Sequence, residues 1–253
     1  MYPHSFWWHY LWIAPDVLLL FIAGIIIHRR LFYEFPMFLA YTVFESLQGA
    51  TLFVLDHSSA ISATVYWNTH WVGLLITIVL RFAVIHEVFA CVFRPYPALM
   101  ELSRVLLRWT TVVLVLTAVA VTASAPKETP YLLSGIHVIN RTVGLVQSGL
   151  LVFLFLFCAY FRLSWRSYAY GIALGLGIFA SVDLATGALR VWIGTPAAGS
   201  YALDFVTMAT YHCSVLIWLV YLLAPETASQ SVQVLPDNNL EQWNAEMQRL
   251  LLR

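Results

Sequence analysis

Charged residues are scarce in this chain. Lys, Arg, Asp and Glu together make up 10% of its 253 residues, whereas a soluble domain carries roughly 25%. So few charges cannot cover a surface that faces water. The 13 basic and 13 acidic residues also balance, which leaves no basic field to hold a polyanion. The composition therefore excludes a soluble enzyme, a disordered chain and a nucleic-acid-binding protein.

Cysteine and lysine are also rare, and each scarcity excludes a class of protein. Cys91, Cys158 and Cys213 lie in or beside apolar runs, so we expect no disulfide framework. The only lysine is Lys127, in a predicted loop. A retinal pigment needs a lysine in its last helix and is therefore excluded. Serine-protease, nucleotide-binding and metalloprotease signatures are absent, so we do not expect an enzyme.

Apolar residues, in contrast, are abundant: 61% of the chain is hydrophobic and the mean hydropathy is +0.79. A membrane-spanning helix needs about 20 mostly apolar residues, and the apolar runs are too long for strands. We predict an all-α, polytopic membrane protein in which residues 1–223 form a seven-transmembrane-helix bundle. The predicted spans are 11–28, 35–55, 64–90, 103–124, 138–161, 168–190 and 202–223.

The distribution of basic residues predicts the orientation. Nine lie on one side of the predicted spans: Arg29, Arg30, Arg94, Arg104, Arg108, Arg162, Arg166, Arg249 and Arg253. Three lie on the other: Lys127, Arg141 and Arg190. Because basic loops stay in the cytoplasm, we expect the N-terminus outside and the C-terminus inside. Helical spans indicate a cytoplasmic (inner) membrane or a plasma membrane.

Residues 224–253 form the predicted cytoplasmic tail. Asp237, Asn238 and Asn239 are residues that cap helix N-termini. After them Leu240, Trp243, Met247 and Leu250 recur at helical spacing. The pattern predicts an amphipathic helix over about 239–252 that lies on the membrane, on the bundle or on a protein partner.

Polar residues inside the predicted spans are the candidate functional residues. Ionisable groups in a bilayer are costly and usually face the bundle interior. The candidates for a ligand-binding or buried polar centre are Glu45, Gln48, Arg81, Asp183 and His212. Their depths place Arg81 within reach of Glu45, and Asp183 at the level of Arg141 or Arg190. Two interpretations stay open: interhelical contacts that fix packing, and a ligand, sensing or proton site.

Histidines suggest two further alternatives. His4, His9, His57, His70 and His137 are predicted near the outer face and are candidate metal ligands. None of them forms a pair with the tight spacing of a helical zinc motif. His28 and His86 are the one pair predicted at a common depth, as two haem ligands require.

Seven helices in this orientation resemble receptor-type modules in topology. The leading hypothesis is a sensory or receptor-like protein that contacts the lipid bilayer, takes a small-molecule ligand in its bundle and signals to a protein partner through its tail. The alternatives are a non-catalytic structural subunit of a larger membrane complex, and a redox or transport protein with a haem or metal site. The identity of the ligand stays open.

Overall fold

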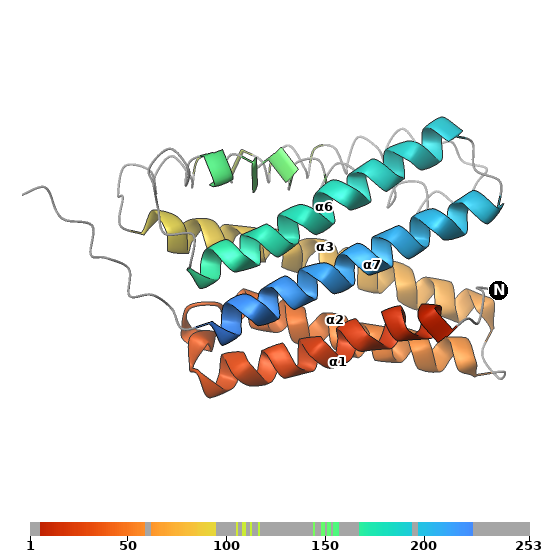
Figure 1. Cartoon of the computed structure of the whole chain (residues 1–253), viewed down its shortest axis with the longest axis horizontal. Helices are drawn as coiled ribbons and strands as arrows, with labels where there is room; N and C mark the ends of the chain where they lie inside the picture. Colours follow the sequence, from red (N-terminus) through yellow and green to blue (C-terminus); the bar gives the residue numbers. More distant parts are fainter. Residues whose placement is uncertain are drawn as a thin grey trace, which may run out of the picture.

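The computed structural model describes residues 6–58, 62–94, 167–193 and 197–224, with separate positions between 105 and 156. These residues are helical and contain no strand (Figure 1). The elements are α1 (Phe6–His28), the short 3-10 helix η1 (Leu31–Tyr33), α2 (Pro36–His57), α3 (Ala63–Phe93), α6 (Tyr168–Ile193) and α7 (Ala197–Leu223).

Five of the described helices are long and apolar enough to cross a membrane. The prediction of an all-helical, multi-pass membrane protein is therefore confirmed for the described part of the chain. The predicted spans 103–124 and 138–161 lie largely outside the described residues, and the predicted tail helix lies wholly outside them. Within the first of these spans, Val105, Trp109, Val112 and Leu116 are helical and exposed.

The direction of the helices bears on the two remaining predicted spans. α3 ends and α6 begins at the same end of the bundle (Figure 1). A connection that leaves and returns at one end crosses the membrane an even number of times. The described helices are therefore compatible with two further spans between α3 and α6, which stay a prediction.

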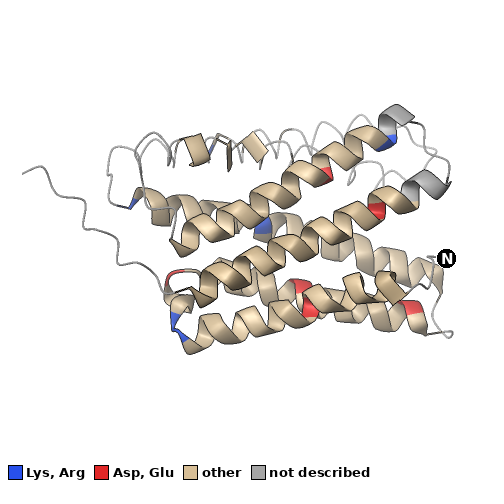
Figure 2. Cartoon of the chain, viewed as in Figure 1, with Lys and Arg blue, Asp and Glu red and all other residues tan. Residues whose placement is uncertain are grey.

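The described helices form a ring. α1 packs against α2, α2 against α3, α6 against α7, and α7 against α1, while a less extensive contact between α3 and α6 closes the circle. We call the end where α1 and α3 finish the arginine end, because Arg29, Arg30 and Arg94 follow these helices. We call the opposite end, where α1 begins, the N-terminal end. Figure 2 shows how few charged residues lie between them.

Two charged side chains fasten helix termini at the arginine end. Glu87 on α3 accepts the backbone N–H groups of Met37 and Phe38, at 2.8 and 2.9 Å, one with each carboxylate oxygen. These donors belong to the first turn of α2, which has no side-chain cap of its own. Arg29 donates to the carbonyl oxygen of Leu223 at 3.3 Å, and a cation at this helix C-terminus is favourable.

The apolar core lies in the half of the bundle next to the arginine end. Its most buried members include Ile22, Phe38, Phe89, Ala173 and Trp218, one from each of the spanning helices.

Within this core, Trp218 packs edge-on against Phe38 and donates its indole N–H to the carbonyl oxygen of Ile172 at 3.1 Å. The same indole lies against Gly175, where an added Cβ would collide with it. α6 and α7 therefore approach as closely as a glycine allows.

Candidate functional site

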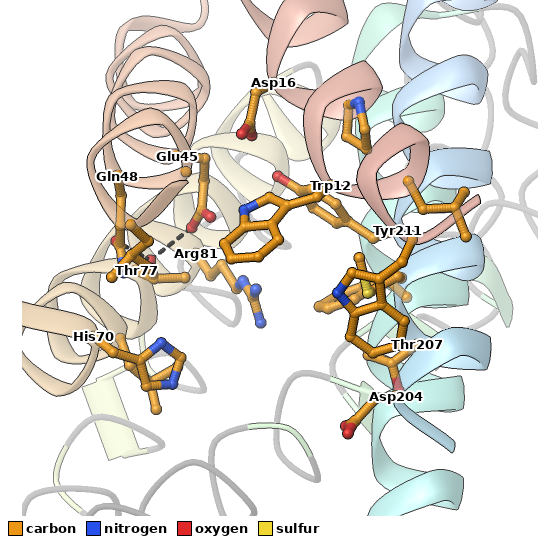
Figure 3. A pocket seen from close by; sticks show the side chains of 18 of the residues that line it. Trp12, Asp16, Glu45, Gln48, His70, Thr77, Arg81, Asp204, Thr207 and Tyr211 are labelled. Atoms are coloured by element: carbon orange, nitrogen blue, oxygen red, sulfur yellow. Dashed lines mark hydrogen bonds between the residues drawn. The ribbon is translucent and has the colours of Figure 1, made fainter. Parts of the chain in front are cut away.

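A cavity occupies the other half of the ring, toward the N-terminal end. Its volume is about 360 Å³, and all five described spanning helices contribute to its wall. Its lining side chains that carry polar atoms include Asp16, Glu45, Gln48, Tyr66, His70, Thr77, Arg81, Asp204, Thr207 and Tyr211, most of them labelled in Figure 3. Apolar and aromatic side chains complete the wall. A cavity with polar groups among membrane-spanning helices is where a functional site is expected.

The structure brings together three of the five candidates of the predicted polar centre. Glu45 and Gln48 on α2 and Arg81 on α3 line the cavity. Glu45 accepts a hydrogen bond from the hydroxyl of Thr77 at 2.6 Å. Gln48 lies against Gly73, where an added Cβ would meet its amide. Glycine at this position therefore lets a long polar side chain lie between α2 and α3.

Arg81 reaches into the cavity from α3 (Figure 3). Its guanidinium stacks over the ring of Phe179, 4.7 Å from the ring centroid, which is a cation–π contact. Glu45 lies within electrostatic range, but the two side chains form no direct ion pair. The Nε atom of Arg81 is buried and has no hydrogen-bond partner. The positive charge is therefore stabilised by an aromatic face and by a carboxylate at a distance.

Asp16 on α1 is a member of the site that the sequence prediction did not include. Its carboxylate lies against Gly49 of α2, where any Cβ would collide with it. Its backbone carbonyl accepts the hydroxyl of Ser46 at 3.0 Å, which holds α1 and α2 together at this level. The signal was present in the sequence, because Asp16 is the single acid that interrupts the run 11–28.

Arg190 has a different partner from the one that its depth suggested. It forms an ion pair with Asp204 of α7, and Asp204 lines the cavity. Asp183 precedes Arg190 by two helical turns on the same helix, so the two side chains lie about 10 Å apart along the axis. Asp204 lies near the start of α7, which begins only four residues after α6 ends. Arg141 lies outside the described residues.

Asp183 and His212 do not line the cavity. Asp183 is within electrostatic range of Arg81, behind the wall. The ring of His212 packs edge-on against Tyr10 at 5.5 Å, in the contact between α1 and α7. Its Nδ1 atom is buried and has no partner. His212 therefore belongs to a helix–helix contact beside the cavity.

The histidines are dispersed. His9 and His57 lie near each other, with ring centroids 5.7 Å apart, and His70 lines the cavity. His4 and His137 lie outside the described residues. In the part of the chain that the structure describes, no three His, Cys, Asp or Glu side chains are grouped as a metal site requires. His28 and His86, the haem candidates, are both exposed.

Comparison with family models, curated proteins and solved structures finds no match to this chain. The cavity is therefore the feature of this chain that indicates a function. Thr77 and Tyr211 join it from α3 and α7 without a specific signal in the sequence, whereas Asp204 is an ionisable residue within the predicted span 202–223. A threonine or a tyrosine in an apolar run is too common to be singled out, and only the helix rotations bring these residues to one space.

Proposed function

We propose that this protein is a receptor-like membrane protein that binds a small ligand in its bundle and signals to a protein partner through residues 224–253. In this proposal the chain crosses the membrane seven times, with its N-terminus outside and its C-terminus in the cytoplasm. The excess of arginine beside the ends of α1 and α3 supports this orientation. The membrane of this proposal is a cytoplasmic (inner) membrane or a plasma membrane.

The observation that carries the proposal is a cavity with unsatisfied polar groups on its wall. Polar residues that served packing alone would each have a neighbour and leave no space between them. Here the hydroxyl of Tyr211 is buried near that of Tyr41, but neither makes a hydrogen bond of normal geometry, and Tyr211 borders a space of about 360 Å³. This volume is at the lower end of the range for small-molecule sites.

Thiol labelling tests whether solutes enter the cavity. In a background with Cys91, Cys158 and Cys213 replaced by Ser, Thr207→Cys on α7 places a thiol on the cavity wall. Ser214→Cys is the matched control on the same helix, because Ser214 is fully buried. Both hydroxyls donate at 3.0 Å to the carbonyl oxygen four residues earlier, so both substitutions remove that bond, and Thr207→Cys also removes a hydroxyl contact with Thr186 at 3.3 Å.

The purified full chain is treated with hydroxyethyl methanethiosulfonate, a small uncharged reagent. We expect Thr207→Cys to react at least about tenfold faster than Ser214→Cys, because a fully buried thiol reacts only when helices open locally. Equally slow labelling at both positions would contradict a ligand cavity. Removal of residues 225–253 is expected to leave the labelling of Thr207→Cys unchanged, since the proposed tail is the output and not part of the site.

The structural-subunit alternative has its own support. Thr77 with Glu45, and Arg190 with Asp204, join neighbouring helices by polar contacts, as packing residues do. If the polar residues serve packing alone, the interior of the chain itself is closed and Thr207→Cys labels as slowly as Ser214→Cys. The labelling of the purified chain therefore decides between the two functions.

A further inference from the structure

The charges on the cavity wall do not balance. Asp16, Glu45 and Asp204 contribute carboxylates, and Arg81 contributes the one guanidinium among the described lining residues. Asp204 is already paired with Arg190. Arg81 lies within electrostatic range of Glu45 and offsets its charge. One carboxylate, that of Asp16, is left without a cation.

Asp16 also has no direct partner. Among the described residues, no side chain or backbone group donates a hydrogen bond to its carboxylate, and its nearest charged neighbour is the carboxylate of Glu45. Gly49 leaves the space that this carboxylate occupies between α1 and α2. Two carboxylates that face one cavity repel each other, and in a medium of low dielectric constant this repulsion is strong. A bound cation would remove it.

The rest of the wall suits an organic cation. Trp8, Trp12 and Tyr66 line the cavity with aromatic rings. Aromatic faces attract ammonium groups, and the attraction is larger where water is excluded. The face of Phe179 already carries Arg81, so an aromatic face in this cavity does hold a cation. The buried hydroxyl of Tyr211 is a further group that a ligand can engage.

We propose that the cavity binds a small, singly charged organic ammonium ion, with its charge at the carboxylate of Asp16 and its apolar part against the tryptophan rings. This inference rests on the proposed function, because it names the class of ligand for the same cavity. A metal ion does not fit the site as well, because the described part of the chain groups no three metal-ligating side chains and the wall is rich in aromatic rings.

The test uses the charge of the labelling reagent as the probe. Thr207→Cys, in the same cysteine-free background, is treated separately with trimethylammonioethyl, sulfonatoethyl and hydroxyethyl methanethiosulfonate. The first reagent is itself a small quaternary ammonium ion. Each rate is divided by the rate of the same reagent with a free thiol in solution, which removes differences in intrinsic reactivity.

We expect the cationic reagent to react about tenfold faster than the anionic one, because a cleft of one charge concentrates ions of the opposite charge. Asp16→Asn is nearly isosteric and should remove most of this preference. Asp56→Asn is the matched control, since Asp56 is a partly exposed carboxylate on α2, 4.0 Å from His57, that does not line the cavity. This control should retain the preference.

A second measurement keeps the test valid if Asp16→Asn does not fold. Choline should slow the reaction of the uncharged reagent with Thr207→Cys, whereas dimethylbutanol, its uncharged carbon analogue, should not. Equal rates for the cationic and anionic reagents, or a preference that survives Asp16→Asn, would overturn the ammonium proposal and leave the ligand cavity standing. If none of the three reagents reaches Thr207→Cys, the proposed function fails as well.

Discussion

The two halves of the helix ring are filled in different ways. At the arginine end, large apolar side chains from every described spanning helix interlock, and Phe38, Val88 and Ala173 have no exposed surface. Toward the N-terminal end, the same helices carry carboxylates, an arginine and one side-chain amide around a cavity. One set of helices therefore provides a packed half and a hollow half.

This difference indicates that one half of the bundle provides most of the stability and the other half provides the candidate site. Inside a bilayer the hydrophobic effect does not drive helices together, so close packing and hydrogen bonds must. The packed half supplies both, through the Trp218 cluster and the capping of α2 by Glu87. The hollow half can then keep unsatisfied polar groups, because the helices are already held in place.

The largest expected effect comes from removing a tryptophan in each half. Trp218→Ala deletes a side chain that is 1% exposed, and we expect a loss of about 3–5 kcal/mol in the free energy of unfolding. Trp12→Ala on the cavity wall should lose less than about half of that, because Trp12 is only partly buried. Unfolding of both variants by detergent titration measures the difference. Equal losses would contradict the division into two halves.

Glu87 should show the next largest effect. In Glu87→Gln the side-chain carbonyl still accepts one backbone N–H group of α2, but the amide NH2 faces the other donor and cannot accept from it. We expect a loss of about 1.5–3 kcal/mol, the usual contribution of a hydrogen bond to a charged group. The same detergent titration measures it, and an unchanged midpoint would show that water or lipid headgroups cap α2 equally well.

Substituting one glycine in each half should have a smaller effect on stability and compares how rigid the two halves are. Gly175→Ala pushes a methyl group into the indole of Trp218, which has no space to move, so we expect a loss of about 1–3 kcal/mol. Gly49→Ala pushes the same group into the carboxylate of Asp16, which can turn into the cavity. We expect the free energy of unfolding of Gly49→Ala to lie within about 0.5 kcal/mol of that of the unsubstituted chain. A loss at Gly49 as large as that at Gly175 would mean that the hollow half is as rigid as the packed half.

The sequence predicted the helices better than the site, for a physical reason. A span is a local property of some twenty residues, so the bounds of α2 and α6 were predicted to within a few residues. α1 begins earlier than predicted, at Phe6, because its aromatic first turn continues the apolar run.

The cavity depends on which face each helix turns to the ring, and this is set by packing between distant segments. Glu45, Gln48 and Arg81 were found because charge and amide groups in a span need a polar surrounding. Asp183 and His212 met the same criterion but do not line the cavity, and His212 packs instead against Tyr10 of α1. The partner of Arg190 is Asp204 on α7, and depth alone does not specify which neighbouring helix supplies it.

The smallest effect is expected for the glutamate of the hollow half. Glu45→Gln keeps an oxygen that accepts the hydrogen bond of Thr77, and the cavity beside it has room for the second amide group. The substitution removes the attraction between Glu45 and Arg81 and also the repulsion between Glu45 and Asp16. Because these two changes oppose each other, we expect a change of less than about 0.5 kcal/mol in the free energy of unfolding, in contrast to the same substitution at Glu87. Detergent titration of the two variants side by side compares equal chemistry in the two halves. If Glu45→Gln is as destabilising as Glu87→Gln, the polar groups of the cavity hold the fold together, and the structural-subunit interpretation replaces the receptor-like one.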